Sequence, residues 1–122
     1  MSTARKILNV TVGEDLRTAA ARTASTLKAV KSGGKVTPYF GVSFEEIGTL
    51  LAAFTPKRWE LVAALRANGP MSVAALARLL QRDYKNVHTD VTQLIEWLAI
   101  ERREDGLVEV PWSDIVVDMK LP

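Results

Sequence analysis

The 122-residue sequence contains no cysteine and one histidine, His88. Without cysteine the chain can form neither a disulfide framework nor a thiolate metal site, and a single imidazole cannot complete a histidine site. We therefore expect no metal ion and no other cofactor. The absence of cysteine also fits a reducing interior, so the sequence predicts a cytoplasmic protein.

The sequence also lacks a long apolar run. No run approaches the roughly 20 residues that a transmembrane helix needs. The first residues, MSTARKILNVTVGEDL, lack the apolar stretch of a secretory signal peptide. We therefore expect a protein that has no membrane partner.

Groups suited to catalysis are scarce as well. A nucleophilic serine, threonine or lysine would need a base beside it, and His88 is the one imidazole of the sequence. The carboxylate pairs at 14–15 and 45–46 lie at expected helix starts, where the helix dipole explains them, and the pair at 104–105 belongs to an expected turn. The segment GVSFEEIG has neither the spacing nor the lysine of a phosphate-binding loop. The sequence therefore predicts a protein that is not an enzyme.

The net charge of +2 is too small to identify a partner, but its distribution along the chain is uneven. Residues 1–54 and residues 55–103 each carry +3, whereas residues 104–122 carry −4. A polyanion would therefore be met by the first two segments. The acidic third segment is either solvated surface or a contact for a basic partner.

A chain of this length normally forms one domain with a small appendage. Residues 6–12, KILNVTV, alternate apolar and polar side chains and predict a strand. Helical spacing follows from residue 14 to about residue 31, where KSGGK ends the helix. We therefore divide the chain into an N-terminal strand-helix extension with its linker, residues 1–42, and a second domain, residues 43–122.

The second domain is expected to contain four helices, a hairpin and a final strand. In SFEEIGTLLAAF, Ser43 and Glu46 have the spacing of a capping box. After the fourth helix, which runs to about Leu98, the segment IERREDGLVEV carries Asp105–Gly106 between two extended runs and predicts a hairpin. The segment DIVVDMKL predicts another strand. The expected N-caps of the last three helices are Thr55 (followed by Pro56), Ser72 and Asp83.

From residue 55 onward the expected order is three short helices and a β-hairpin, joined by short connections. These are the parts of a winged helix-turn-helix, in which the third helix is the recognition element. The fold class is therefore mainly α with a small β component (α+β): a winged helix-turn-helix with an N-terminal strand-helix extension. Residues 83–98 occupy the place of the recognition helix.

At 100° per residue, this helix divides into two faces. The apolar face, which would hold the helix against the other two, consists of Tyr84, Val87, Val91, Leu94 and Leu98. The opposite side presents hydrogen-bonding groups suited to base edges and phosphates, and two hairpin arginines would reach the backbone or the minor groove. The candidate DNA-binding residues are Arg82, Lys85, Asn86, His88, Thr89, Thr92, Gln93, Arg102 and Arg103.

Each of these residues also has a simpler interpretation. Taken alone, residues such as Lys85, Thr89 and Gln93 more often only make an exposed helix face polar. Charged residues such as Arg102 and Arg103 more often prevent an edge strand from pairing with another chain. The single histidine, taken alone, is more often a surface or half-buried residue than a base or a metal ligand. The combination of a short helix pair, a capped third helix with a polar outer face and an Asp–Gly hairpin with paired arginines favours binding to double-stranded DNA.

Residues 55–121 resemble winged-helix transcriptional regulators of the multiple-antibiotic-resistance-regulator (MarR) group. The segments that carry the resemblance are TPKRWELVAAL (55–65), GPMSVAALARLLQRDYKNVHTDVTQL (69–94) and IERREDGLVEVPWSDIVVDMKL (100–121). The resemblance implies a sequence-specific DNA-binding transcriptional regulator, a repressor acting as a dimer. Several small regulators of this kind resemble antitoxins, which implies an alternative: a protein that neutralises a cognate toxin and autoregulates its operon. Such domains commonly have glycine where the recognition helix ends, and this chain has Ala99 there, so we expect a differently built turn.

The strand and helix of residues 6–31 are too small to bury their apolar surface alone. They must pack on the second domain, on a second copy or on another protein. Because a regulator reads two half-sites with a symmetric dimer, we expect a homodimer formed with help from residues 1–31 or from the C-terminal strand. A basic partner such as a toxin would contact the acidic segment 104–122.

Overall fold

The structure, a computed structural model, describes residues 6–13 and 40–121. The helix predicted between residues 14 and 31, and most of the linker after it, lie outside the described residues. Within these described ranges, no helix is both long and apolar enough to cross a bilayer.

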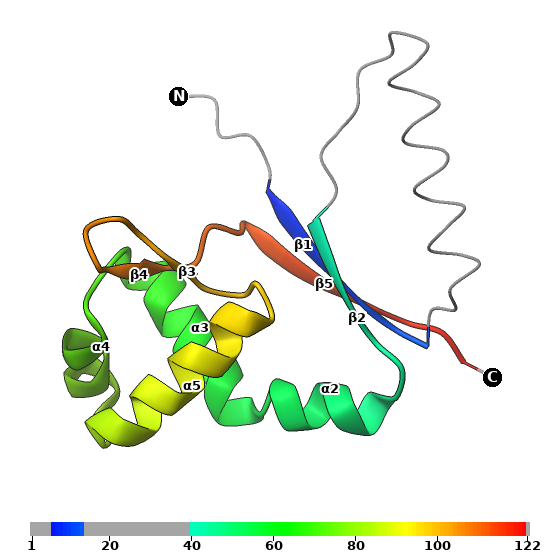
Figure 1. The fold of residues 1–122 in the computed structure, drawn as a ribbon, viewed down its shortest axis with the longest axis horizontal. Helices are drawn as coiled ribbons and strands as arrows, with labels where there is room; N and C mark the ends of the chain where they lie inside the picture. Colours follow the sequence, from blue (N-terminus) through cyan, green and yellow to red (C-terminus); the bar gives the residue numbers. More distant parts are fainter. Residues whose placement is uncertain (1–5, 14–39, 122) are drawn as a thin grey trace, which may run out of the picture.

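The described residues form a mixed α and β structure, as the sequence predicts (Figure 1). The predicted strand at residues 6–12 and the predicted C-terminal strand are both confirmed. The strands are β1 (Ile7–Val12), β2 (Phe40–Phe44), β3 (Glu101–Arg102), β4 (Val108–Glu109) and β5 (Asp114–Met119). The helices are α2 (Ile47–Ala53), α3 (Pro56–Asn68), α4 (Val73–Leu80) and α5 (Tyr84–Glu96).

Two of the predicted N-caps are confirmed with their hydrogen bonds. The Thr55 hydroxyl oxygen accepts from the backbone N–H of Arg58 at 3.2 Å and begins α3. The Ser72 hydroxyl oxygen accepts from the backbone N–H of Ala75 at 3.1 Å and begins α4. Each cap satisfies one of the donors that a helix start leaves unpaired, so both boundaries follow from local chemistry.

The predicted capping box of Ser43 and Glu46 is wrong. Ser43 lies in β2, where its hydroxyl is 3.1 Å from that of Thr11 on β1. Helix α2 begins three residues later than predicted, and its N-cap residue Glu46 makes no capping hydrogen bond with its side chain. Pairing with β1 gives residues 40–44 backbone hydrogen bonds that one local cap cannot replace, so the tertiary contact decides their conformation.

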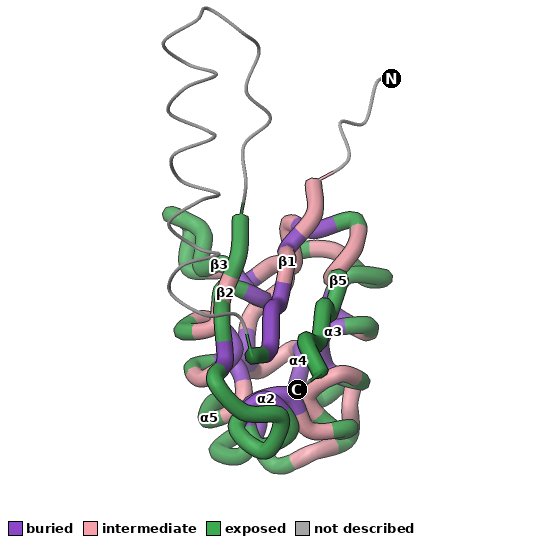
Figure 2. Tube along the Cα trace, turned by 90° about the vertical axis from the view of Figure 1, so that its right-hand side faces the viewer, coloured by how far each residue is buried: buried purple, intermediate pink, exposed green. Residues whose placement is uncertain are grey.

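The largest sheet has the order β2-β1-β5, and both pairings are parallel. In this register Leu8, Val10 and Val12 of β1 share a face with the apolar side chains of β2 and β5 beside them. All three β1 residues are buried, as expected for the central strand of a parallel sheet. Figure 2 shows this buried strand between the more exposed β2 and β5. Residues near the two ends of the chain therefore form one sheet.

Helices α3, α4 and α5 and the β3–β4 hairpin form the other part of the molecule (Figure 1). Their core contains Leu61 and Leu65 of α3 and Leu76 of α4, each fully buried. Trp112 joins this part to the sheet. Its indole N–H donates to the Leu98 carbonyl at 2.7 Å, and its ring lies edge-on to the ring of Phe40 on β2, with 5.2 Å between the two ring centroids. The two parts therefore share one continuous core.

Two turns determine the shape of this hairpin, one at its tip and one before its first strand. Gly106 has φ +86°, as the Asp–Gly pair predicts for the tip of a tight hairpin. Before the hairpin, the left-handed residue is Leu98 with φ +68°, and not Ala99, which is buried. The turn is therefore built differently from a glycine-capped one, as expected, and it places a leucine in a conformation that ordinarily costs about 1–2 kcal/mol.

Candidate nucleic-acid interface

Helix α5 is anchored by its apolar face. Val87, Val91 and Leu94 are each 0% exposed, and they pack in the core shared with α3 and α4. The same prediction was wrong for Tyr84 and Leu98, which are both exposed. Tyr84 is the first residue of the helix and Leu98 lies two residues beyond its last residue, so neither is at a position that the neighbouring helices cover.

The outward side of α5 carries the predicted polar residues. Lys85, Asn86, His88, Thr89 and Thr92 are exposed. Two of them have a fixed hydrogen bond: the Thr89 hydroxyl donates to the Lys85 carbonyl at 3.0 Å, and the Thr92 hydroxyl donates to the His88 carbonyl at 2.9 Å. Because the hydroxyl protons are used within the helix, both threonines present an acceptor oxygen and a methyl group outward.

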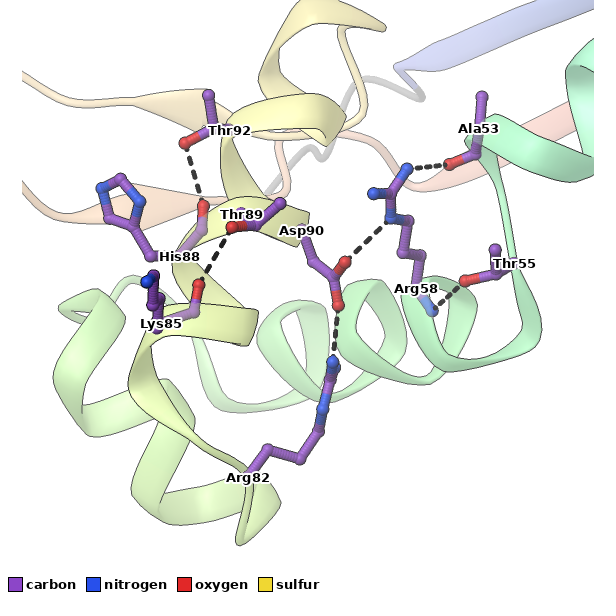
Figure 3. A network of polar contacts seen from close by, with 9 residues as sticks. All are labelled: Ala53, Thr55, Arg58, Arg82, Lys85, His88, Thr89, Asp90 and Thr92. Carbon is purple, nitrogen blue, oxygen red and sulfur yellow. Dashed lines mark hydrogen bonds and ion pairs between the residues drawn. The ribbon is translucent and has the colours of Figure 1, made fainter.

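The donors on this surface are therefore the longer side chains. Figure 3 shows Lys85 and His88 on the side of α5 that faces away from Asp90. The exposed ring of Tyr84 lies 5.9 Å from that of His88, so an aromatic surface adjoins the donors. Gln93, one turn further along, is half-buried. The surface thus combines a cation, neutral donors, acceptors and a ring within the first three turns of one helix.

Asp90 holds α5 in place through two arginines. One of its carboxylate oxygens accepts from Arg58 Nε at 3.0 Å, and the other accepts from Arg82 Nη2 at 2.7 Å. The same Arg58 guanidinium donates from Nη1 to the Ala53 carbonyl at 2.9 Å. The three charged side chains are only 14–21% exposed. This network, drawn in Figure 3, connects the end of α2, the start of α3 and the α4–α5 connection to the middle of α5.

Arg82 does not lie with the outward residues. Its guanidinium turns toward Asp90 and is half-buried, and its buried nitrogen Nη1 has no hydrogen-bond partner in the part of the chain that the structure describes. The prediction placed Arg82 near Lys85 because the spacing of 100° per residue was extended back to residue 82, which precedes the helix. Residues 81–83 connect α4 to α5, with Gln81 in the left-handed conformation, so Arg82 lies before the helix that carries Lys85 and does not follow its spacing.

The start of α5 differs from the prediction in one respect. Asp83 occupies the N-cap position, but its side chain makes no capping hydrogen bond. The backbone N–H groups of the first turn therefore keep their capacity to bind an anion, while the exposed Asp83 carboxylate opposes one nearby. The two effects act at the same end of the helix as Lys85.

The two hairpin arginines have different surroundings. Arg103 forms ion pairs with Asp105 at 3.1 Å and with Glu109 at 3.7 Å, so the hairpin itself supplies its counter-charges. Arg102 makes one long hydrogen bond, from Nη1 to the Gly106 carbonyl at 3.5 Å. Both side chains are exposed. Arg102 is therefore the freer of the two cations on the hairpin.

Sequence reasoning missed Asp90 and Arg58. A signal for Asp90 exists: it lies three residues after Val87 and four before Leu94, which places it at the border of the buried face. A carboxylate at such a position requires a partner when the helix packs. The identity of that partner depends on how α3 crosses α5, which no local pattern contains.

Among residues 6–13 and 40–121, no group of three or more histidine, aspartate or glutamate side chains is arranged to hold a metal ion.

The comparison with protein families gives one match. The model of the family HVO_A0114 matches residues 53–117, which is more than half of the chain and extends from the end of α2 into β5. Neither the search of curated proteins nor the search of solved structures finds a match. The matched region contains α3, α4, α5 and the hairpin, and on this evidence the chain belongs to the HVO_A0114 family.

Proposed function

We propose that the protein binds double-stranded DNA sequence-specifically as a transcriptional regulator, with α5 as the recognition helix of a winged helix-turn-helix. The observation that carries the proposal is the division of α5. Its inner residues Val87, Val91 and Leu94 are fully buried, while Lys85, Asn86 and the residues that follow on the other side are exposed. A helix held this firmly by one face can present the other to a groove without losing its contacts.

The local geometry supports the helix-turn-helix part of the proposal. Helix α4 ends at Leu80 and α5 begins at Tyr84, so three residues connect them. The short antiparallel hairpin β3–β4 follows α5 and is held to the loop before α4 by the bridge between Met71 and Val108. This order and these short connections are typical of a winged helix-turn-helix.

The exposed side chains support the choice of DNA as ligand. Lys85 is suited to a phosphate or to guanine, and Asn86 to adenine. The outward methyl groups of Thr89 and Thr92 are suited to the methyl group of thymine. Arg102, the freer cation of the hairpin, is suited to the backbone or the minor groove beside the site. In each case the major or minor groove presents a group that this type of side chain can bind.

The experiment that tests the proposal is enrichment of bound duplexes from a random library, followed by affinity measurements on the enriched sequence and on a scrambled one. We expect a defined motif and an affinity that falls steeply with salt, because lysine and arginine release counterions from DNA. Lys85→Ala should reduce the preference for the enriched sequence by about tenfold, which is about 1.4 kcal/mol and lies within the roughly 1–3 kcal/mol that a specific base contact contributes. Lys57→Ala removes the same charge from an exposed position on α3 and should leave that preference unchanged. If no motif is enriched, the proposal fails.

A further inference from the structure

Strand β5 leaves apolar side chains at the edge of the sheet. The order β2-β1-β5 gives β5 one strand neighbour, β1, among the described residues. Val116 and Val117 are each 43% exposed, Met119 is equally exposed, and Leu121 just beyond the strand is 82% exposed. Figure 2 shows β5 at one side of the sheet with this stretch exposed. Natural proteins usually protect such an edge, so a group of exposed apolar side chains there indicates a partner.

At this edge the backbone groups of β5 have no partner strand among residues 6–13 and 40–121. Lys120 donates its backbone N–H to the Val12 carbonyl at 2.8 Å, so the peptide groups of Lys120 face β1. Successive residues of a strand direct these groups to opposite sides. Those of Val117 and Met119, at odd spacing from Lys120, therefore face the free edge.

We propose that β5 pairs antiparallel with β5 of a second copy of this chain, about a twofold axis at Val117. A twofold axis makes the interface isologous, so both copies use the same strand. Each contact then occurs twice: residue i of the first copy contacts residue j of the second, and residue j of the first contacts residue i of the second. The axis at Val117 keeps β5 paired over its whole length, because the strand extends three residues to one side and at least two to the other. The ladder then continues the sheet across the dimer.

The charges of β5 select this register from its neighbours. With the axis at Val117, Asp114 of each copy lies opposite Lys120 of the other. A shift of the axis to Val116 would place Asp114 of each copy opposite Asp118 of the other. A shift of the axis to Asp118 would place the two Asp118 carboxylates opposite each other. Like charges directly opposite each other destabilise a strand pair, whereas opposite charges stabilise it. The register at Val117 is therefore the one that the sequence of β5 favours.

An apolar groove beside the start of β5 supplies a second contact for the same register. The groove has a volume of about 220 Å³ and lies between α3 and the segment that leads into β5. Its lining is mainly apolar but also contains two charged residues: it includes Trp59, Val62, Trp112 and Ile115 together with Arg66 and Asp114. The axis at Val117 places Leu121 of the second copy opposite Ser113, on the face that Ile115 shares. Leu121, the most exposed leucine among the described residues, thus meets the groove of the second copy.

This interface is separate from the surface proposed to bind DNA. Figure 1 shows the C-terminal end of β5 at the opposite end of the molecule from α4 and the start of α5. Pairing through β5 therefore leaves the outward residues of both α5 helices exposed. The inference is tested by the association of the protein with itself, without DNA, and its failure would not affect the DNA proposal.

The first test uses the absence of cysteine, which gives each variant a single thiol. Under mild oxidation Val117→Cys should form a disulfide-linked dimer, because residues on the axis lie directly opposite each other at a separation that a disulfide spans. Val116→Cys is the matched control: it is equally exposed, but its two copies would be diagonal neighbours, too far apart to be joined. Failure of Val117→Cys to cross-link, or equal cross-linking of both variants, would overturn the proposed register.

The second test measures association by sedimentation velocity. The wild-type chain should sediment as a dimer at tens of micromolar. Leu121→Asp should raise the dimer Kd by roughly tenfold or more, because it places a charge in the apolar groove. Leu51→Asp changes another exposed leucine, on α2, and should leave the Kd unchanged. Circular dichroism verifies that both variants are folded. A monomeric wild-type chain, or equal effects of the two variants, would refute the interface.

Discussion

Replacing Asp90 with asparagine is expected to destabilise the protein strongly although it changes the shape of the side chain little. The carboxylate of Asp90 receives hydrogen bonds from Arg58 at 3.0 Å and from Arg82 at 2.7 Å. Asparagine keeps one acceptor oxygen but directs an NH₂ group toward the other guanidinium, which is also a donor. The substitution therefore removes one hydrogen bond and leaves two half-buried cations without their shared counter-charge.

The magnitude follows from the burial of the three side chains. Each hydrogen bond to a charged group is worth about 1.5–3 kcal/mol, and breaking a fully buried pair by removing one partner costs about 3–5 kcal/mol. The side chains here are 14–21% exposed, so water reaches them in part and the cost should lie at the lower end. We expect Asp90→Asn to lower the free energy of unfolding by about 3 kcal/mol.

The assay is urea unfolding followed by tryptophan fluorescence and circular dichroism. Asp118→Asn is the control, because that carboxylate pairs with Lys120 at 3.1 Å but is 51% exposed, and a solvated pair of this kind is worth about 0.5 kcal/mol or less. Arg82→Ala should cost less than Asp90→Asn, since Asp90 keeps its bond to Arg58 and Arg82 Nη1 has no protein partner to lose. An Asp90→Asn variant as stable as Asp118→Asn would refute the reasoning.

Three further expectations concern the helix starts and the hairpin. Asp83→Asn should tighten DNA binding by roughly threefold, measured by fluorescence anisotropy, because it removes a negative charge beside the anion-binding start of α5. Gln81→Gly should raise the free energy of unfolding by about 1 kcal/mol in urea titrations, because the exposed Gln81 is in the left-handed conformation that glycine adopts without strain. Arg102→Ala should reduce the salt dependence of DNA binding by about one counterion, whereas Arg103→Ala, whose charge the hairpin already neutralises, should change it less; equal slopes for the two would contradict the difference in their surroundings.

The candidate interface was predictable where it depends on helical spacing. The period of 3.6 residues assigns Val87, Val91 and Leu94 to one side of α5 and Lys85 and Thr89 to the other, and burial in the structure agrees with this division. The prediction was less successful for groups whose position depends on another element. The helical spacing placed Arg82 near Lys85, but its guanidinium pairs with the Asp90 carboxylate of α5 at 2.7 Å.

The hairpin shows the same distinction at a smaller scale. The Asp–Gly pair predicts a tight turn, and Gly106 has the positive φ that this turn requires. The paired arginines were treated alike because they are adjacent in the sequence. They differ in the structure because Arg102 is the last residue of β3, whereas Arg103 lies just beyond the strand, within reach of the acidic residues Asp105 and Glu109.

The sequence by itself determined the features that neighbouring residues control: the caps at Thr55 and Ser72, the buried stripe of α5, and the turn at Gly106. Only the tertiary structure decided which strands pair. The parallel partner of β1 on one side is β5, more than a hundred residues away, and pairing on its other side draws Ser43 from an expected helix cap into β2. A cap or a turn is stabilised by groups within a few residues, whereas a strand satisfies its backbone with any compatible strand that the whole fold brings beside it.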